Sequence, residues 1–491
     1  SLFALIAQLS GPTTSLSTFT AASVVKNGLQ KAGFEITKLP GFGGKREMIA
    51  AQKTTAPQVL ATPSSDKKDF AAPWATRRQP QAAGERHALI IGGGLAGCHT
   101  ARALAERHWQ VTLIEQHDEL ATEGSGNPQA VLYAKLSPRH EPLAQFNLAA
   151  LLYAQRFYQP LWQSLGESFG QACGVLQLAH TEAEARLQQS LRDSYGNAPG
   201  LVNFCTPQEA SAQAGVELEH PAVYFPDAGW INPPALCRHL ADHPNIYVTR
   251  HTNVGVLRRL NNVWQIDDKH GQAIAAAPVV VVATANHSQQ FSQTQHLPLR
   301  PIRGQISYLP ATTASRRLKT VVCSDGYLAP ARQSDTDYHS LGATFNLKDP
   351  DTAIRPADHR YNWDKLVANT PALAQCFTPP DPAQQHGRVA FRCTTRDYLP
   401  LAGPVPNYEE FLQDYAPLRK DAKTRIDSAG NYWPGLFANF GHGSRGLAYA
   451  PLCAALVADQ IDNAALPVSR ELATALNPAR FIIRDLIRKK L

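Results

Sequence analysis

The chain has 491 residues, of which 44% are hydrophobic, 18% charged and 8% aromatic. At roughly 100–200 residues per domain this length predicts more than one folded unit, and the composition excludes a disordered or fibrous protein. The net charge of +7 favours a polyanionic partner such as a nucleic acid without requiring one.

Membrane insertion and metal binding are not expected. The longest apolar run, Ala273–Ala283, contains Pro278 and is shorter than the roughly 18 residues of a membrane span. The eight cysteines are scattered without a C-x-x-C pair, which favours reduced thiols and a cytoplasmic location. No His, Cys, Asp or Glu cluster has the spacing of metal ligands. The sequence does not predict the oligomeric state.

The first fifty residues have the pattern of a small unit. Strands are predicted at Ser17–Thr20 and Phe34–Leu39, with a helix over Ala22–Ala32 between them. Residues 51–85, rich in Ala, Pro, Thr and basic residues, are predicted to be a solvated linker. The chain opens on an apolar, helix-like pattern and has a single methionine, Met48, so we expect it to be part of a longer polypeptide.

A β-α-β unit is predicted next, with strands at His87–Ile91 and Val111–Ile114 and a helix over Ala96–Arg107. Beyond it a helix is predicted over Leu143–Leu165, and then short strands alternate with helices. Residues Gln305–Leu347 have the turns and strand signals of an antiparallel layer, and Gly446–Ile461 is again helical. The strands predicted along the body are Val175–Leu178, Ala222–Phe225, Ile246–Thr249, Val263–Ile266 and Val279–Val282.

A dinucleotide site is predicted inside the β-α-β unit. A G-x-G-x-x-G motif follows the first strand and opens the helix, where the glycines allow a tight turn, the approach of a pyrophosphate, and close helix packing. The second strand ends at Glu115, eighteen residues after the last glycine, where a carboxylate can bind ribose hydroxyls. The predicted cofactor-binding residues of this unit are Gly92, Gly94, Leu95, Ala96, Gly97 and Glu115.

The sequence favours a flavin over a nicotinamide cofactor. Val279–Val282 reads as a buried strand ending in a small-residue turn, a feature that flavoproteins place against the first dinucleotide unit, although an ordinary core strand has the same pattern. Glu115 argues against a cofactor with a 2′-phosphate.

Several motifs downstream complete a resemblance to a known family. Together with residues 92–97 and Glu115, they resemble the FAD-dependent D-amino-acid-oxidase-like superfamily and, within it, the oxidoreductase half of MnmC, a family of bifunctional tRNA-modifying enzymes. The resemblance extends from about residue 86 to residue 491. The motifs are Gly124-Ser125-Gly126-Asn127-Pro128, Gly229-Trp230-Ile231-Asn232-Pro233, Arg303-Gly304-Gln305, Asp325-Gly326-Tyr327, Phe391–Pro400 and Gly443-Ser444-Arg445-Gly446-Leu447.

The resemblance implies a mixed α/β fold in which a FAD-binding Rossmann domain joins an antiparallel-sheet substrate domain. A remnant of a methyltransferase domain would precede them, because Ser17–Ala22 and Gly41–Met48 resemble the last strands of that domain. The implied bounds are 1–50 for the remnant, 51–85 for the linker and 86–491 for the oxidoreductase. Within the oxidoreductase, the FAD-binding parts are about 86–150, 270–305 and 390–465, and the substrate-binding parts are about 175–265 and 305–390.

The implied reaction is the FAD-dependent removal of the carboxymethyl group from 5-carboxymethylaminomethyl-(2-thio)uridine at the tRNA wobble position, giving 5-aminomethyl-(2-thio)uridine and glyoxylate. FAD would be bound non-covalently. S-adenosylmethionine would serve only the methyltransferase half, whose cofactor motif and catalytic acid are not in this chain. Two alternatives stay open: an oxidase of free glycine or sarcosine, and an inactive flavin-binding tRNA scaffold.

The resemblance also implies roles for individual residues. Arg392 is the best candidate to bind the substrate carboxylate, although it could instead form an ordinary ion pair between domains. Arg445 is a second candidate that could contact the flavin instead, and Tyr327 is expected near the flavin ring, although a turn would explain it as well. Residues expected to line the cofactor are Asn127, Gly304, Gly443, Ser444, Gly446 and Leu447.

Two groups of charged or polar side chains receive weaker assignments. His442 is interpreted as structural rather than as a base, because the substrate amine needs only to be neutral. The basic residues of Arg480–Lys490 and of the linker are candidates for binding tRNA, or else a solvated surface. The linker residues in question are Lys67, Lys68, Arg77 and Arg78.

Overall fold

The computed structural model divides the chain into two units, Ser1–Ala71 and Ala72–Leu491. The residues that the structure describes are 2–8, 10–11, 14–41, 46–54, 72–77, 85–166, 168–196, 200–332 and 337–491. In these residues, no helix has both the length and the apolar character needed to cross a membrane.

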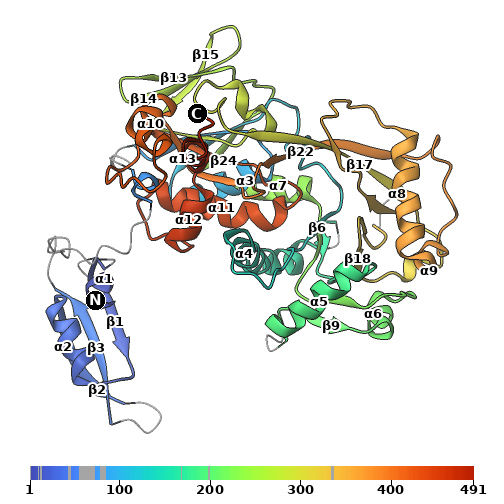
Figure 1. Ribbon diagram of the computed structural model, residues 1–491, viewed down its shortest axis with the longest axis horizontal. Helices are drawn as coiled ribbons and strands as arrows, with labels where there is room; N and C mark the ends of the chain where they lie inside the picture. Colours follow the sequence, from blue (N-terminus) through green and yellow to red (C-terminus); the bar gives the residue numbers. More distant parts are fainter. Residues whose placement is uncertain are drawn as a thin grey trace. The chain divides into compact units, whose positions relative to one another are not determined.

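The first unit is a small antiparallel sheet with two helices (Figure 1). Leu29, Phe34 and Ile49 form the centre of its core. The last strand runs to Lys53, which pairs with Phe34, so the linker predicted to begin at residue 51 begins later. Most of that linker, 55–71 and 78–84, lies outside the described residues. The elements are α1 (Leu2–Gln8), β1 (Ser15–Thr18), α2 (Ser23–Lys31), β2 (Phe34–Pro40) and β3 (Glu47–Lys53), in the strand order β1-β3-β2.

The second unit is built on a six-stranded sheet whose strands are parallel except for one edge strand. Its first strand was predicted with the observed bounds, and Val279–Val282 is buried throughout, as its continuous apolar run indicates. Ile246–Thr249, expected in the substrate-binding part, pairs with the second strand of the β-α-β unit instead. In spatial order the strands are β12 (Ile246–Thr249), β5 (Gln110–Ile114), β4 (His87–Ile91), β16 (Val279–Val282), β24 (Tyr432–Phe440) and β23 (Leu401–Pro406).

Alternate residues of these strands enter two different cores, one on each face of the sheet. Ile90 and Val281 pack against the helices of one face, and Leu89 and Val280 pack against a three-stranded meander on the other. Trp264 is fully buried in the meander core. The helices are α3 (Leu95–Ala105), α4 (Pro142–Leu165), α7 (Pro233–Ala241) and α11 (Gly446–Ile461), and the meander is β13 (Val256–Leu260), β14 (Val263–Asp267) and β15 (Ala273–Ala277).

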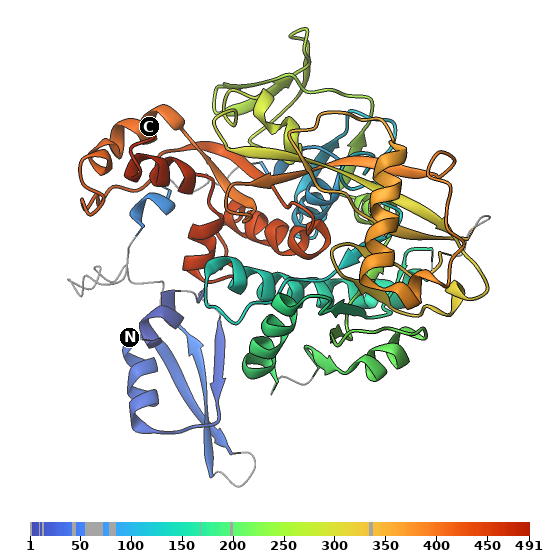
Figure 2. The ribbon, with the colours of Figure 1, turned by 45° about the vertical axis from the view of Figure 1, so that its right-hand side comes forward.

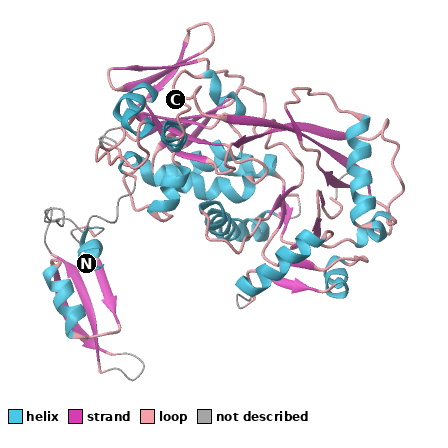
Figure 3. Cartoon of the chain, viewed as in Figure 1, coloured by secondary structure: helices cyan, strands magenta, loops and turns pink. Residues whose placement is uncertain are grey.

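A nine-stranded, mainly antiparallel sheet forms the other half of this unit, with α8 (Pro356–Asn369) packed on it (Figure 3). Its strand order begins at β21 and β17, and β22 pairs with β17 off the main path. The strands are β8 (Val175–Leu178), β9 (Asn203–Cys205), β10 (Ala222–Phe225), β17 (Leu299–Pro310), β18 (Val321–Cys323), β19 (Tyr327–Leu328), β20 (Tyr338–Gly342), β21 (Asn346–Leu347) and β22 (Gly387–Thr395).

A long ribbon made of β17 and β22 joins the two halves (Figures 1 and 2). At one end, Leu299 and Cys393 belong to the core shared by the six-stranded sheet and its meander. At the other end, Leu309 belongs to the core of the nine-stranded sheet. Strand β17 is therefore anchored in both halves, and β22 pairs along it.

The remaining elements close the edges of the unit. A small sheet is formed by β6 (Ala130–Leu132), β7 (Gly170–Gln171) and β11 (Gly229–Ile231). The other helices are α5 (Glu182–Tyr195), α6 (Pro207–Ala214), α9 (Pro371–Ala374), α10 (Tyr408–Asp414), α12 (Arg470–Leu476) and α13 (Arg480–Ile487).

Candidate active site

A cavity of about 540 Å³ lies where the six-stranded sheet, the β17–β22 ribbon and the turn before α11 meet. Its wall includes the carboxyl ends of β4, β5 and β16, the place where open α/β sheets bind ligands. The volume lies within the about 300–1,000 Å³ of small-molecule sites. Strands distant in the sequence thus meet at one ligand-sized site.

The G-x-G-x-x-G turn has two glycines that shape it and one that begins the helix. Gly92 has φ +108°, and a Cβ there would lie 2.7 Å from the Ala283 carbonyl oxygen. A Cβ on Gly97 would lie 1.8 Å from the Gly92 carbonyl oxygen, so this glycine lets helix and turn touch. Gly94 precedes α3, and Leu95 and Ala96 in its first turn line the cavity. The helix N-terminus therefore faces the cavity, as phosphate binding requires.

Glu115 is held in place by two backbone donors. The Gly93 N–H donates to one carboxylate oxygen at 2.7 Å, and the His117 N–H donates to the other at 2.9 Å. The side chain is buried and forms part of the cavity wall. A carboxylate oxygen accepts more than one hydrogen bond, so Glu115 can still receive ribose hydroxyls.

The turn between β24 and α11 repeats the spacing of the first glycine motif, with glycines at 441, 443 and 446. Gly443 has φ +59°, and its N–H donates to the Cys393 carbonyl at 2.7 Å. A Cβ on Gly446 would lie 3.1 Å from Leu95 Cδ1, so α11 and α3 begin side by side. Residues of this turn that line the cavity include Gly443, Ser444, Gly446 and Leu447.

His442, in the same turn, is a neutral group. Burial lowers the pKa of His442 to about 4, and its Nε2 lies 2.9 Å from Asn439 Oδ1. A base with this pKa is uncharged at neutral pH, in agreement with the structural role interpreted from the sequence.

Arg392 is a half-buried cation in the cavity wall. Its Nη1 donates to the Thr344 carbonyl at 3.0 Å, and no acidic side chain among the described residues forms an ion pair with it. Burial lowers the pKa of Arg392, while Tyr327 and Tyr133 raise it. A partly desolvated guanidinium without a counter-ion is stabilised by a bound anion, so the site is suited to a carboxylate. The ordinary ion pair considered from the sequence does not form.

Gly304 makes room for this guanidinium. It lies on β17 beside β22, and a Cβ there would lie 2.3 Å from Arg392 Nη1. Tyr327 lines the same cavity, and its hydroxyl donates to the Gln129 carbonyl at 3.3 Å. Burial raises the pKa of the Tyr327 phenol, which therefore stays protonated.

Comparison with curated proteins identifies the relatives of the chain. It is 43% identical over 489 residues to a tRNA 5-methylaminomethyl-2-thiouridine biosynthesis bifunctional protein MnmC from Pseudomonas savastanoi pv. phaseolicola, covering 99% of this chain and 72% of that protein. The protein of the same name from Chromobacterium violaceum is 42% identical over 493 residues, covering 100% of this chain and 72% of the relative. The chain belongs to the MnmC family.

Family models divide this MnmC-family chain into the same two parts as the sequence analysis does. The model of the FAD dependent oxidoreductases matches residues 87–460, and the model of the S-adenosyl-L-methionine-dependent methyltransferases matches residues 1–54. The predicted family, fold class and FAD-dependent oxidoreductase are thereby confirmed, and the methyltransferase match covers the segment that was predicted to belong to such a domain.

Solved structures confirm the fold. Glycine oxidase from Geobacillus kaustophilus superposes with a TM-score of 0.63 at 20% identity, covering 80% of this chain and 98% of that one. Iminodiacetate oxidase from Chelativorans sp. BNC1 gives a TM-score of 0.60 at 19% identity, covering 78% and 97%. Both likenesses concern the fold of the MnmC oxidoreductase part.

The cavity of this MnmC-family chain fits FAD. Because Gly92 and Gly97 have no side chains, they leave space at the N-terminus of α3, and a hydrogen bond fixes Glu115 beside it. Asn286 Oδ1, in the cavity wall after β16, is buried and has no hydrogen-bond partner among the described residues, so it can accept from a bound cofactor. Among the described residues, no three His, Cys, Asp or Glu side chains gather to form a metal site.

Arg445 does not join Arg392 in the cavity wall of the MnmC fold. Its Nη1 donates to the Tyr449 hydroxyl at 3.2 Å, while its neighbours Ser444 and Gly446 line the cavity. A catalytic role for Arg445 stays a prediction, with a geometry that favours holding the start of α11.

Asn127 lies in the cavity wall, and its Oδ1 accepts a hydrogen bond from Arg388 Nη1 at 3.1 Å. Arg303 and Gln305, which flank Gly304 in the motif Arg303-Gly304-Gln305, are fully buried and face α8. The Arg303 guanidinium donates to Asp358 at 2.5 Å, and Gln305 Nε2 donates to the Arg355 carbonyl. Of that motif, only Gly304 lies in the cavity wall.

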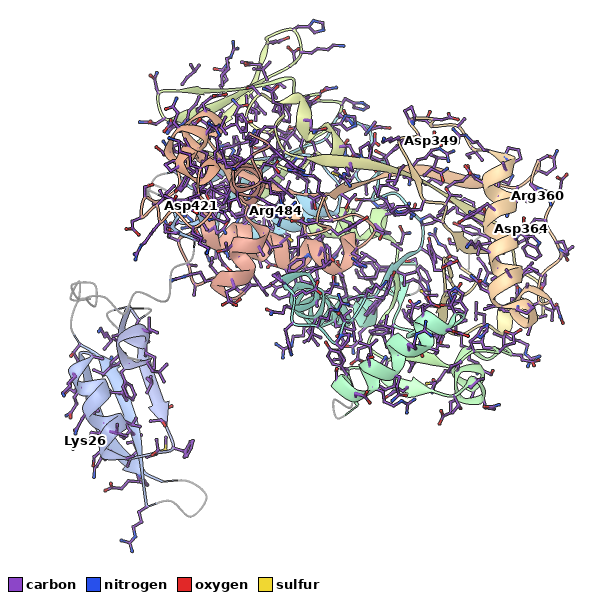
Figure 4. The ribbon with its side chains drawn as sticks, viewed as in Figure 1. Lys26, Asp349, Arg360, Asp364, Asp421 and Arg484 are labelled. Carbon is purple, nitrogen blue, oxygen red and sulfur yellow. The ribbon has the colours of Figure 1, made fainter. Side chains whose placement is uncertain are left out.

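Three of the basic residues considered for tRNA are used inside the molecule. Arg480 and Arg484 form ion pairs with Asp397 at 3.0 and 2.9 Å, and Arg484 lies on the C-terminal helix (Figure 4). Arg77 donates to the Gln460 carbonyl at 2.8 Å. This removes the basis for assigning these side chains to tRNA, while Lys67, Lys68 and Arg78 lie outside the described residues.

Sequence reasoning missed three side chains of this MnmC site. Tyr133 and Phe345 line the cavity near Arg392, and Arg388 ties the segment 122–127 to β22. Tyr133 and Phe345 lie outside the glycine motifs, and nothing in their local pattern separates them from core aromatics. For Arg388, its place four residues before Arg392, on the same face of one strand, was an available signal.

Proposed function

We propose that the chain oxidatively removes the carboxymethyl group from 5-carboxymethylaminomethyl-(2-thio)uridine at the wobble position of tRNA. The products are 5-aminomethyl-(2-thio)uridine and glyoxylate. The observation that carries the proposal is the half-buried Arg392 guanidinium, which has no acidic partner among the described residues and lies in the wall of a cavity suited to FAD. The relatives' role in tRNA 5-methylaminomethyl-2-thiouridine biosynthesis supports the choice of substrate.

The cofactor would be held by the backbone of residues 92–96 at its pyrophosphate, by Glu115 at a ribose, and by the turn before α11 at its ring. We propose that no covalent bond joins it to the protein. When bound, FAD supplies the two-electron chemistry by accepting the hydride of the substrate C–H bond.

Arg392 fixes the geometry of the reaction. A bidentate hydrogen bond to the substrate carboxylate positions the CH₂ group that lies between carboxylate and nitrogen. Loss of hydride from this carbon and of a proton from nitrogen leaves a C=N bond. Water adds to that carbon, the C–N bond breaks, and glyoxylate leaves while the amine stays on the uridine. No protein nucleophile is needed.

The neutral side chains around Arg392 have supporting roles. Tyr327 stays protonated and keeps its hydroxyl on the Gln129 carbonyl, so it adds no negative charge beside the carboxylate. Neutral His442 likewise adds no positive charge that would oppose the positive charge developing on the substrate nitrogen as hydride leaves. Because tRNA and reduced thiols are found together in the cytoplasm, we propose that location.

Mass spectrometry of wobble nucleosides tests the proposal. Hypomodified tRNA carrying the carboxymethylaminomethyl group is incubated with the FAD-loaded protein, and the expected product is aminomethyl-uridine with an equal amount of glyoxylate. Oxidation of free glycine or sarcosine with unchanged tRNA would support the amino-acid oxidase instead. Bound tRNA with neither product nor bleaching of the flavin would support the inactive scaffold.

A further inference from the structure

Phe345 is an exposed aromatic residue in the wall of a deep cavity. It follows β20 and precedes β21, and 53% of its surface is accessible. The residue before it, Thr344, is buried and fixed: its N–H donates to the Gln305 carbonyl, and its hydroxyl accepts from the Gln305 N–H at 2.9 Å. The backbone that carries Phe345 is thus fixed at the cavity wall.

The Phe345 ring lies beside the proposed carboxylate site. Arg392 Cζ is 5.7 Å from the ring centroid, and Arg392 Nη1 donates to the carbonyl of Thr344. The guanidinium and the aromatic ring are therefore positioned by the same short segment of chain. A ligand held by Arg392 through its carboxylate has the Phe345 ring as a neighbour.

We propose that Phe345 stacks on the pyrimidine ring of the substrate nucleotide. This inference rests on the proposed function, and it adds the residue that distinguishes a nucleotide-borne amine from a free amino acid. In the substrate, four single bonds of about 1.5 Å each separate the ring from the carboxylate carbon. Fully extended, this arm spans about 5 Å, which is similar to the 5.7 Å between Arg392 Cζ and the ring centroid of Phe345.

Aromatic stacking suits this position chemically. Unstacked bases of RNA loops are bound on aromatic side chains, which read the face of the base and not its edge. Such a contact tolerates oxygen or sulfur at position 2 of the uridine. Without a ligand, the exposed face of the phenyl ring contributes nothing to stability. A bound base would bury this face.

The test compares Phe345→Leu, which keeps an apolar side chain without a π face, with Phe345→Tyr, which keeps the ring. With substrate tRNA, Phe345→Leu is expected to raise KM about 10-fold, the lower part of the range for loss of one stacked base, and Phe345→Tyr is expected to restore most of the affinity. Leu347→Ala, which removes an exposed apolar side chain two residues further on, is the matched control. FAD content is measured for every variant.

A competitor without a base separates stacking from an effect on Arg392. N-methylglycine carries the carboxymethylamine but no pyrimidine, and its inhibition constant against tRNA is expected to be the same in wild type and Phe345→Leu. An unchanged KM for tRNA in Phe345→Leu would overturn the proposal. An equal rise in the KM for tRNA and in the inhibition constant would also overturn it, because Phe345 would then act through Arg392.

Failure of the proposed function gives a different result. Wild-type protein that leaves the wobble nucleoside unchanged contradicts the proposed reaction before any Phe345 variant is compared. Wild-type protein that converts the nucleoside, together with an unaffected Phe345→Leu variant, contradicts the stacking inference alone.

Discussion

At the scale of single residues, two arginines on neighbouring strands have opposite uses. Arg303 is fully buried against Asp358 on α8, whereas Arg392 is half-buried in the cavity wall and has no acidic partner among the described residues. Each arginine lies among ordinary strand residues in the sequence, so the local sequence pattern does not distinguish their two roles. The difference depends on α8, which begins about fifty residues after Arg303 and supplies a counter-ion to one arginine only.

Replacing Arg392 tests the carboxylate site directly. Arg392→Lys is expected to raise KM for substrate tRNA by about 10- to 100-fold while FAD stays bound, because an ammonium group is a point charge that cannot make the paired hydrogen bonds. Steady-state kinetics and the flavin absorbance of the purified variant check this. Unchanged kinetics would move the carboxylate site elsewhere, with Arg445 the next residue to test.

Gly304 was expected to bind the cofactor, and the structure favours a role in positioning Arg392. Gly304→Ala places a Cβ 2.3 Å from the guanidinium and is expected to displace it, raising KM for tRNA about as much as Arg392→Lys does. FAD content and KM are measured together. Loss of FAD with an unchanged KM in the remaining holoenzyme would assign Gly304 to the cofactor instead.

Stability has a pH dependence that comes from buried histidines. Burial lowers the pKa of His99 to about 3, with a smaller contribution from His442, and Tyr158 accepts a hydrogen bond from the neutral His99 ring. The unfolded state therefore binds the proton more readily. The stability gained above pH 6.5 is lost as the pH falls toward 3, by about 2 kcal/mol per such group at pH 5.

The variant His99→Gln isolates this contribution, because a glutamine amide can still donate to Tyr158. Urea unfolding at pH 7.5 and pH 5 is expected to show a loss of stability about 2 kcal/mol smaller in the variant than in wild type. The same loss in both proteins would mean that His99 does not titrate as a buried neutral group.

At the scale of elements, short and mainly apolar runs were enough to predict several strands. His87–Ile91, Val175–Leu178 and Val279–Val282 have the predicted bounds, because each is a short, mainly apolar run between turn residues. Ile246–Thr249 was also predicted with its observed bounds, but it was assigned to the wrong half of the fold. Ile246–Thr249 pairs with β5, which lies more than a hundred residues earlier in the chain, and no local sequence pattern carries that information.

Strand β22 connects the cofactor site to the carboxylate site. Arg388, four residues before Arg392, donates to Asn127 Oδ1 at 3.1 Å and to the backbone carbonyls of Thr122 and Glu123. It therefore holds the segment 122–127, part of which lines the cavity, against the strand.

The substitution Arg388→Gln tests this connection. It removes the charge from three hydrogen bonds and is expected to weaken FAD binding about 10-fold, measured by the recovery of flavin fluorescence on dilution. Arg316→Gln, which alters an exposed pair between a turn after β17 and Asp337 just before β20, is the control and is expected to keep wild-type affinity. Equal affinity in both variants would show that the segment 122–127 is held by other contacts.

At the scale of the whole molecule, the methyltransferase match covers residues 1–54, and the described part of this segment is a three-stranded sheet with two helices. Both turns with the G-x-G-x-x-G spacing lie in the second unit, at the cavity that fits FAD. The cofactor of the methylation step has no corresponding turn in the described residues of the first unit.

We therefore expect the 491-residue chain to stop at the amine. Incubation with substrate tRNA and labelled S-adenosylmethionine should give glyoxylate and aminomethyl-uridine without label in the RNA. Transfer of label by this chain would contradict the prediction and assign a methyl-donor site to residues 1–54.

The ribbon of β17 and β22 is a mechanical link as well as a scaffold. The two ends of the ribbon are fixed in different cores. The halves of the second unit therefore cannot move apart as rigid bodies without breaking the backbone hydrogen bonds between β17 and β22. The conformational change needed for substrate binding then has to occur in the RNA. The wobble nucleotide has to turn out of its stack and enter the cavity, a movement that costs less in a single-stranded loop than in a duplex. We therefore expect that an anticodon paired with a codon is not a substrate, whatever its modification state.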